Sequence, residues 1–375
     1  MIEQEIKREA LRLGFSAAGI APAAALQNRR DDMLRWLQKG MAGPLGYMQE
    51  FFERQRRFLD GFPEARSLVV LAADYPIGAT EREFDSPAGR IARYALAPDY
   101  HKVLRRRLKL LETTICGLSG GTPRIRKTID TSAIQERVLA EAAGLGFFGK
   151  NNCLIRPKGG SFFFICALIT DLALEPDPPP QRKWSCGSCT LCIEACPTGA
   201  LTEPYNLDAA RCVSSLTIEV KGPVPQQTRA GLKDWLFGCD ICQEVCPYNR
   251  PERKPCAEDF PVILPEKLSL AGLLGCRSEL EFKALFQGTA LKRAGREGMV
   301  RNAAIAAGNS QDPVLVLGLA DCLLHDASPV IRSHAAWALG RIDTADARKC
   351  LAEAAGREID PTAKQEISQA LAQTL

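Results

Sequence analysis

The sequence predicts a multidomain α+β protein made of three consecutive parts. A mixed α/β domain is expected at residues 1–175, a cysteine-rich module at 176–258 and helical repeats at 259–375. Strand-like and helix-like patterns alternate in the first part, which predicts a sheet covered by helices. Eight of the 15 cysteines lie between positions 186 and 246, and an alanine-rich helical segment recurs in the last part.

The composition is that of an ordinary globular protein. Its 375 residues, 46% hydrophobic and 25% charged, are enough to bury more than one core. The formal net charge of +4 is compatible with a polyanionic partner but is too weak to identify one. No apolar run approaches the roughly 18 residues of a membrane span, and the N-terminal MIEQEIKREALRLGF does not resemble a signal peptide. We therefore expect a cytoplasmic monomer with no membrane partner.

The first part has the pattern of a mixed α/β sheet domain. Apolar runs rich in β-branched and aromatic residues predict strands, whereas apolar residues at helical spacing predict helices. The expected strands are residues 67–75, 124–130 and 161–170. The expected helices are the N-terminal segment, residues 99–116 and residues 133–144.

The cysteine-rich module contains two runs that are typical of bacterial ferredoxins. The first, CGSCTLCIEACP, has the spacing CxxCxxCxxxCP, in which the fourth cysteine binds the other cluster of a two-cluster protein. The second, CDICQEVCP, lacks one CxxC step, which the lone Cys212 replaces. Eight thiolates predict two 4Fe-4S clusters in a ferredoxin-like module. The first cluster is assigned to Cys186, Cys189, Cys192 and Cys246, and the second to Cys196, Cys212, Cys239 and Cys242.

Two zinc sites built from CxxC pairs are the alternative for these cysteines. Zinc sites rarely carry CxxCxxCxxxCP with a repeated terminal Cys-Pro pair, so the spacing favours iron-sulfur clusters. Disulfides are not expected, because the sequence shows no secretion signal and a reducing cytosol keeps thiols free.

The last part contains an internal repeat. VRNAAIAAG at 300–308 returns as IRSHAAWALG at 331–340, an offset of 31 residues between Val300 and Ile331. Both copies have helical spacing and are followed by another helical segment, which predicts stacked HEAT-like hairpins. Two copies are too few for a stable stack, so we expect them to pack against the cysteine-rich module or their own divergent flanks.

The chain resembles the epoxyqueuosine reductases along nearly its full length. The similar segments are RYALAPDYHKVL (93–104), IDTSAIQERVLAEAAGLGFFGKNNCLI (129–155), WSCGSCTLCIEACPTGAL (184–201), RCVSSLTIE (211–219) and GCDICQEVCP (238–247). The resemblance implies an enzyme that binds cobalamin and two 4Fe-4S clusters. Enzymes of this family reduce epoxyqueuosine to queuosine at the wobble position of tRNA, the last step of queuosine biosynthesis. The first part would then be a cobalamin-binding catalytic domain.

The resemblance also implies roles for residues of the first part. Asp130 matches the proposed proton donor of the family, and its alternative is a capping or dipole role at the next helix. His101, which follows the expected helix N-cap Asp99, is expected to line the site and to contact substrate. The candidate cobalamin contacts are Arg57, Asp130, Lys150, Asn151, Asn152, Cys153 and Asp240, with a solvated basic face as the alternative for the cations.

The implied partners are a tRNA anticodon loop carrying epoxyqueuosine and an external electron donor such as flavodoxin or ferredoxin. Phosphate contacts would supply most of the affinity for tRNA. The candidate contacts are His101, Lys221, Arg229, Arg296 and Arg301. For Arg301 and Arg332, which recur at one repeat position, a structural role inside the stack is the alternative.

Two other functions are compatible with the same cysteines. One is a corrinoid iron-sulfur reductase that acts on a small molecule, as the related reductive dehalogenases do. The other is a non-catalytic electron carrier of ferredoxin type. The helical repeats argue against the first, because a small substrate does not require them, and a bound corrinoid would argue against the second.

Overall fold

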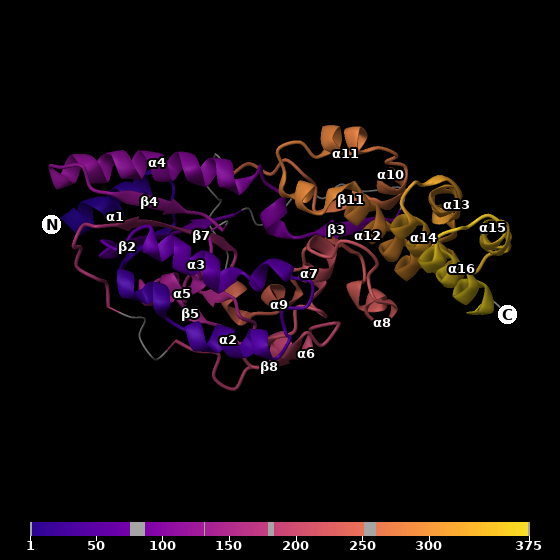
Figure 1. Cartoon of the computed structure of the whole chain (residues 1–375), viewed down its shortest axis with the longest axis horizontal. Coiled ribbons are helices and arrows are strands. Elements are labelled where there is room, and N and C mark those ends of the chain that lie inside the picture. Colours follow the sequence, from indigo (N-terminus) through magenta and orange to yellow (C-terminus); the bar gives the residue numbers. More distant parts are fainter. Residues whose placement is uncertain (1, 76–86, 131, 179–183, 251–259, 374–375) are drawn as a thin grey trace. The chain divides into compact units, whose positions relative to one another are not determined.

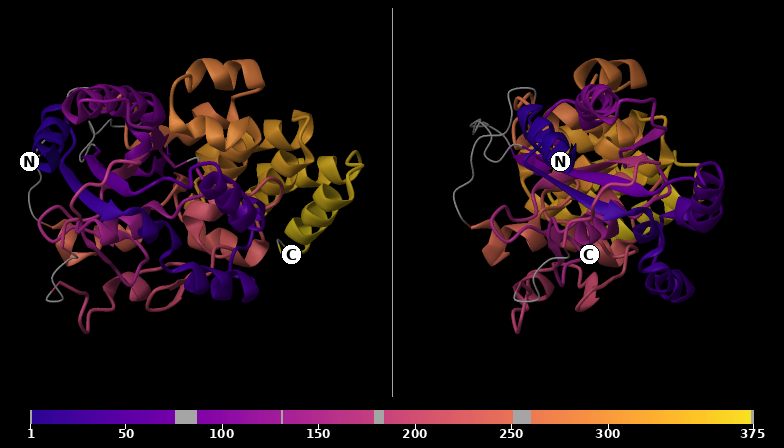
Figure 2. Two further views of the ribbon diagram at one scale, coloured as in Figure 1. Left: turned by 60° about the vertical axis from the view of Figure 1, so that its left-hand side comes forward. Right: turned by 90° about the vertical axis from the view of Figure 1, so that its left-hand side faces the viewer.

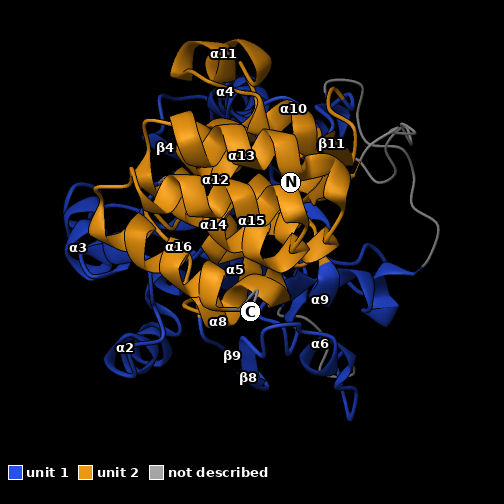
Figure 3. Ribbon diagram, turned by 90° about the vertical axis from the view of Figure 1, so that its right-hand side faces the viewer, with its two compact units in different colours: residues 1–77, 97–208, 241–262 blue, residues 78–96, 209–240, 263–375 orange. Residues whose placement is uncertain are grey.

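A computed structural model describes residues 2–75, 87–130, 132–178, 184–250 and 260–373. The chain divides into two compact units that interleave along the sequence (Figure 3). Unit 1 comprises residues 1–77, 97–208 and 241–262, and unit 2 comprises residues 78–96, 209–240 and 263–375. These boundaries do not follow the three consecutive domains that we expected.

Unit 1 is built on a four-stranded sheet with the order β1-β2-β7-β4, in which every pair is antiparallel. The strands are β1 (Ala17–Pro22), β2 (Ser67–Asp74), β4 (Ile125–Thr128) and β7 (Phe163–Thr170). β2, β4 and β7 are the strands that the sequence predicts. β1 was not predicted, because its sequence AAGIAP is rich in alanine and glycine, which have low strand propensity.

Helices cover both faces of this sheet (Figure 1). On one face α1 (Ile2–Arg12) and α4 (Tyr100–Ser119) pack against alternate strand residues such as Val69 and Leu71. On the other, α3 (Phe51–Asp60) and α5 (Glu136–Ala142) pack against the intervening residues such as Leu68 and Val70. Because successive side chains of a strand point to opposite faces, the central strands are apolar throughout.

The rest of unit 1 consists of short elements. Two two-stranded antiparallel hairpins pair β5 with β6 and β8 with β9. Two single-turn helices, α6 and α9, carry a cysteine of each run. The bounds are η1 (Ala23–Gln27), α2 (Arg30–Gln38), η2 (Gly46–Met48), β5 (Phe147–Phe148), β6 (Leu154–Ile155), α6 (Leu191–Glu194), β8 (Leu201–Glu203), β9 (Asn206–Leu207), α9 (Ile241–Glu244) and η5 (Pro247–Asn249).

Unit 2 begins with a three-stranded sheet and short helices. β3 (Ala88–Ile91) lies between β10 (Trp235–Phe237), which is parallel to it, and β11 (Lys267–Ser269), which is antiparallel. The neighbouring elements are η3 (Arg93–Ala95), α7 (Val213–Ile218), α8 (Gln226–Arg229), η4 (Ala230–Leu232), α10 (Leu270–Leu274), α11 (Glu279–Leu285), η6 (Ala290–Arg293) and η7 (Pro313–Leu315).

The helical stack of unit 2 contains the two predicted repeats as α12 (Gly295–Ser310) and α14 (Pro329–Ile342). α16 (Pro361–Gln373) continues the stack beside α14, while α13 (Val316–His325) and α15 (Ala345–Ala355) complete the hairpins. Figure 2 shows these orange and yellow helices from two further sides. A third layer and the contacts of α12 with α7 and β10 supply the neighbours that two copies lack.

Small residues let the helices of the stack approach closely. A Cβ atom added to Gly308 of α12 would lie 2.6 Å from Trp337 Cζ3 and 2.9 Å from Ala338 Cα. A Cβ atom on Gly340 would lie 2.8 Å from Ala370 Cβ. Both contacts are shorter than van der Waals packing permits, so the spacing of α12, α14 and α16 depends on these two glycines.

We expect Gly308→Ala to destabilise the stack even though alanine favours a helix. Overpacking against the α14 backbone should cost about 1–3 kcal/mol and outweigh the gain of about 1 kcal/mol in helix propensity. Gly318→Ala in α13 is the matched control, because its nearest atoms are 3.5 Å away. Thermal unfolding should show a lower midpoint for Gly308→Ala only, and equal midpoints would contradict this account of the packing.

Candidate active site and cluster ligands

Asp130 lies in a turn that follows β4, with a backbone φ of 53° in the left-handed region. Aspartate adopts this conformation more readily than most residues, and its use here points to a functional constraint. The side chain is 64% exposed, and its Oδ2 accepts a hydrogen bond of 2.5 Å from Tyr100 Oη. α5 begins only at Glu136, after the N-cap Gln135. The capping alternative for Asp130 is therefore wrong.

His101 lies in the first turn of α4, beside Asp130. As predicted, Asp99 caps this helix, because its Oδ1 accepts a hydrogen bond of 3.0 Å from the His101 backbone N–H. The same oxygen lies 2.8 Å from His101 Nδ1, which fixes the orientation of the ring. Nε2 lies 3.7 Å from Asp130 Oδ2 and has no hydrogen-bond partner among the described residues. The ring thus turns a titratable nitrogen toward the exposed carboxyl group.

Tyr100 contacts the same carboxyl oxygen as His101. Its ring stacks on His101 at a centroid distance of 4.2 Å and on Phe164 of β7 at 4.3 Å. This stacking fixes the phenol, so that its hydroxyl group donates to Asp130. Tyr100 was not predicted as a site residue. Its place in the first turn of a predicted helix, next to His101, was the available signal.

Glu136 is a second carboxyl group near Asp130, and it was not predicted as a site residue. Burial, together with the nearby Asp130 carboxylate, raises the pKa of Glu136 to about 8, although backbone N–H groups oppose this shift. Its Oε1 is buried and has no hydrogen-bond partner in the described part of the chain. The group is therefore protonated at neutral pH. In the sequence it looks like an ordinary acidic residue in the first turn of a helix.

The four cysteines assigned to the first cluster all belong to unit 1. Cys246 packs among Phe147, Ile155 and Cys186, in apolar surroundings that Trp184 and Tyr248 complete. Burial and the proximity of Cys186 and Cys189 raise the pKa of Cys192 to about 11. Burial raises the pKa of Cys246 as well. Thiols this close together need the positive charge of iron to remain thiolates, so the set fits a cluster.

The cysteines assigned to the second cluster come from both units. Cys196 and Cys242 belong to unit 1, and Cys212 and Cys239 belong to unit 2. Burial raises the pKa of Cys196, but backbone amides, including that of Ala200 at 3.3 Å from Sγ, outweigh burial and lower it. No group of three His, Cys, Asp or Glu side chains in the described ranges could hold a metal ion. A 4Fe-4S cluster sets a different requirement, because each thiolate binds a different iron.

Side chains of the turn between β5 and β6 donate hydrogen bonds to the cysteine loops. Lys150 Nζ donates to the carbonyl groups of Gly187 and Cys189, and Asn151 Nδ2 donates to that of Cys242. These two side chains are therefore engaged within unit 1, and their assignment as cobalamin contacts stays a prediction. The neighbouring Asn152 has a left-handed backbone, and the Cys153 amide donates to Asn151 Oδ1.

The other two candidate cobalamin contacts lie in different surroundings. Arg57 is an exposed residue of α3 whose Nε donates to the Glu53 carbonyl group, and it remains accessible to an anion. Asp240, in unit 2, is only 2% exposed, and its carboxylate accepts from the Arg93 amide. Asp240 thus offers almost no surface to a cofactor.

Arg229 and Arg301 are interior residues of unit 2. Arg301 is 1% exposed and donates to the carbonyl groups of Leu216, Val220 and Gly222. Arg229 is 3% exposed and forms a two-point ion pair with Glu366. Neither guanidinium group can reach a phosphate. Their burial corrects the prediction that they contact tRNA, and for Arg301 it agrees with the structural alternative.

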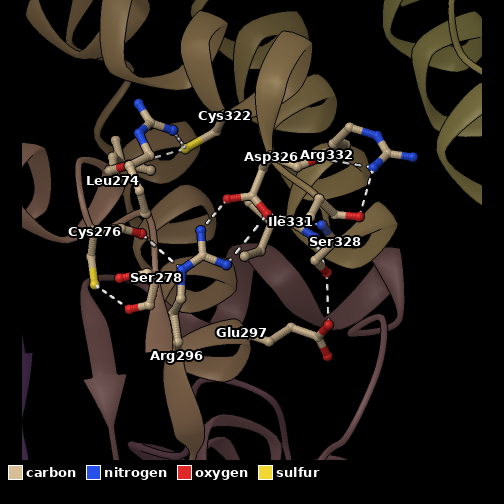
Figure 4. Close-up of polar contacts among 12 residues, drawn as sticks. Leu274, Cys276, Ser278, Arg296, Glu297, Cys322, Asp326, Ser328, Ile331 and Arg332 are labelled. Carbon is tan, nitrogen blue, oxygen red and sulfur yellow. Dashed lines mark hydrogen bonds and ion pairs between the residues drawn. The ribbon is translucent and has the colours of Figure 1, made fainter. Parts of the chain in front are cut away.

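Arg296 is also held inside the stack (Figure 4). Its Nε donates to the Cys276 carbonyl group at 2.9 Å, and its two terminal nitrogens face the Asp326 carboxylate. Arg332 joins the same network by donating to the Asp326 carbonyl group and to Glu358. Arg296 is therefore a structural residue. Lys221 is exposed, but its Nζ donates to the Arg293 carbonyl group at 2.8 Å.

Comparison with known proteins places these features together in one family. Residues 57–131 match the family described as Epoxyqueuosine reductase QueG, DUF1730. Residues 185–249 match a 4Fe-4S double cluster binding domain, and residues 289–372 match HEAT repeats. These matches confirm the predicted fold class. No helix in the described ranges is both long and apolar enough to cross a membrane.

Relatives and solved structures match nearly the whole chain. The chain is 37% identical to an epoxyqueuosine reductase of Pseudomonas aeruginosa over 91% of this chain and 94% of the relative. It is 33% identical to that of Bacillus subtilis over 99% of this chain and 95% of the relative. It is also similar to a crystal structure of epoxyqueuosine reductase with an epoxyqueuosine-modified tRNA-Tyr stem loop, with a TM-score of 0.85 and 33% identity over 99% and 98% of the two chains.

Glu136→Gln should remove part of the pH dependence of stability. Between pH 4.5 and about 8 the folded protein keeps a proton on Glu136 that the unfolded chain releases, so stability falls as the pH rises. The contribution is complete below pH 4.5 and is lost as the pH passes about 8. Thermal unfolding at pH 5, 6.5 and 8, with exposed Glu50→Gln as the control, should show a weaker pH dependence for Glu136→Gln alone. A wild-type slope would contradict the protonated state.

Proposed function

Because this chain belongs to the epoxyqueuosine reductase family, we propose that it reduces epoxyqueuosine to queuosine at the wobble position of tRNA, using cobalamin and two 4Fe-4S clusters. The observation that carries the proposal is the exposed Asp130 carboxyl group, held by Tyr100 and faced by His101, in the unit that also holds six of the eight cysteines assigned to the clusters. The family matches support this function over a small-molecule reductase or an electron carrier. We further propose that the enzyme is a cytoplasmic monomer and that it receives its electrons from a flavodoxin or a ferredoxin.

The reaction defines what the protein has to supply. Removing the epoxide oxygen converts the two C–O bonds into a C=C bond and one water molecule, which consumes two electrons and two protons. The clusters pass electrons singly, and cobalamin, when bound, supplies a centre for the two-electron chemistry. Arg57, with its exposed guanidinium group on α3, is suited to an anionic group of that cofactor.

The residues around Asp130 are suited to the proton transfers. Asp130 Oδ2 gives a proton to the departing oxygen, and the Tyr100 hydroxyl group stabilises the carboxylate that remains. His101, held by Asp99, faces the same oxygen and can return a proton to it after a small movement. The stacked Phe164 ring keeps this side of the site apolar.

The tRNA contacts must come from exposed basic residues. The wobble nucleotide has to leave the stack of the anticodon loop to reach Asp130. α4 continues directly from His101 and carries exposed Lys102, Arg105 and Lys109. These cations are placed to meet phosphates of a nucleotide that contacts His101.

The reconstituted protein should bind about eight irons, because eight thiolates are assigned to two cubanes. With cobalamin, a strong reductant and epoxyqueuosine-containing tRNA, it should form queuosine, which mass spectrometry of the nucleosides detects. Iron near half that amount would refute the two-cluster assignment. Full cofactor loading without queuosine would refute the proposed function.

Asp130→Asn should retain iron and cobalamin but lose turnover by about 100-fold or more, the usual effect of a missing general acid. Tyr100→Phe should lose less turnover than Asp130→Asn, because the Asp130 carboxyl group remains. Exposed Asp346→Asn in α15 is the control and should turn over at the wild-type rate. Single-turnover rates measured with saturating reductant report this step. A wild-type rate for Asp130→Asn would exclude it as the proton donor.

A further inference from the structure

Lys150 is held in the hairpin turn between β5 and β6, beside the first cysteine run. The Gly149 amide donates to the Cys153 carbonyl group at 2.8 Å, and the Asn152 amide donates to the Gly149 carbonyl group at 2.9 Å. Asn152 takes a left-handed conformation with φ of 62°, which tightens the turn. The flanking strands β5 and β6 pair through Phe147 and Ile155, which also pack against Cys246.

Lys150 makes three donor contacts to the loop of Cys186 and Cys189. Its backbone N–H points to Cys186 Sγ at 3.4 Å, and its Nζ donates to the carbonyl groups of Gly187 at 2.8 Å and Cys189 at 2.9 Å. Its own carbonyl group accepts from the Tyr205 amide at 3.0 Å. Lys150 thus fixes the loop that carries two ligands of the first cluster.

The ammonium charge of Lys150 is not neutralised nearby. No ion pair joins Lys150 to a carboxylate within the described ranges, since its Nζ contacts are carbonyl oxygens. A 4Fe-4S cluster gains one negative charge on reduction. A cation and an N–H···S contact beside the cluster stabilise the reduced form more than the oxidised form, because both interact more strongly with the greater negative charge.

We propose that Lys150 is a positioning residue that raises the reduction potential of the cluster bound by Cys186, Cys189, Cys192 and Cys246. The inference rests on the cluster assignment of the proposed function. It adds that this cluster is made easier to reduce, so that it can accept an electron from the external donor. Asn151 of the same turn donates to the Cys242 carbonyl group, so the turn also holds the second cysteine run.

The test is a redox titration of the reconstituted protein followed by electron paramagnetic resonance. Lys150→Met removes the charge and the side-chain donors, and Lys150→Gln removes the charge but keeps a donor. In both, the midpoint of one cluster should fall by about 59 mV, which is a tenfold change in a one-electron equilibrium. Lys150→Arg keeps the positive charge and the side-chain donors, so it should have the wild-type midpoint. Exposed Lys158→Met should leave both midpoints unchanged.

Unchanged midpoints in Lys150→Gln, with full iron content, would overturn the proposal and leave Lys150 a purely structural role. If Lys150→Met loses iron, Lys150→Gln alone tests the proposal. A lowered midpoint in that variant supports the proposal, and unchanged midpoints overturn it. The measurement does not depend on turnover, so it separates this inference from the proposed function. A wild-type protein that binds its irons but forms no queuosine would refute the latter and leave the former intact.

Discussion

The structure depends on holding several cysteine sulfurs close together. Burial and, to a lesser degree, the neighbouring thiols disfavour a thiolate, as the raised pKa of Cys192 shows, so a loop that collects such groups needs compensation from iron and from fixed donors. Lys150 and Asn151 supply those donors from one turn, to carbonyl groups of both cysteine runs. This turn therefore holds both cysteine loops of unit 1 through hydrogen bonds.

α5 connects that turn to the candidate active site. At its start, Glu136 lies behind the Asp130 turn, with its carboxyl group buried and protonated. The next residue, Arg137, donates to the Asn152 carbonyl group in the turn that contains Lys150. In the proposed function, the groups for electron supply and for proton supply therefore share one short helix, which packs on the sheet through Leu139 and Ala140. A displacement of α5 would disturb both functions together.

Recurring sequence patterns predicted secondary structure and the cysteine-rich module. The orientation of individual side chains could not be predicted. The β-branched runs of β2 and β7 and the repeat at Val300 and Ile331 predicted elements that the structure contains, and the cysteine spacing predicted a double-cluster domain that the family match supports. β1 escaped because alanine and glycine give no strand signal. The contacts of Lys150 and the burial of Glu136 could not be predicted, because a linear sequence does not show which way a side chain points.

The buried arginines show why charge alone was a poor guide to RNA contacts. Where helices of the stack meet loops, backbone carbonyl groups are removed from water and need donors. Arginine supplies five N–H groups in a planar fork, and Arg301 uses them on three carbonyl groups while Asn302 serves those of Thr217 and Leu236. The arginine that recurs in the repeat thus stabilises the stack by donating to buried carbonyl groups. In the proposed function, the electrostatic attraction of tRNA therefore has to come from exposed cations such as those of α4, the helix that begins beside His101.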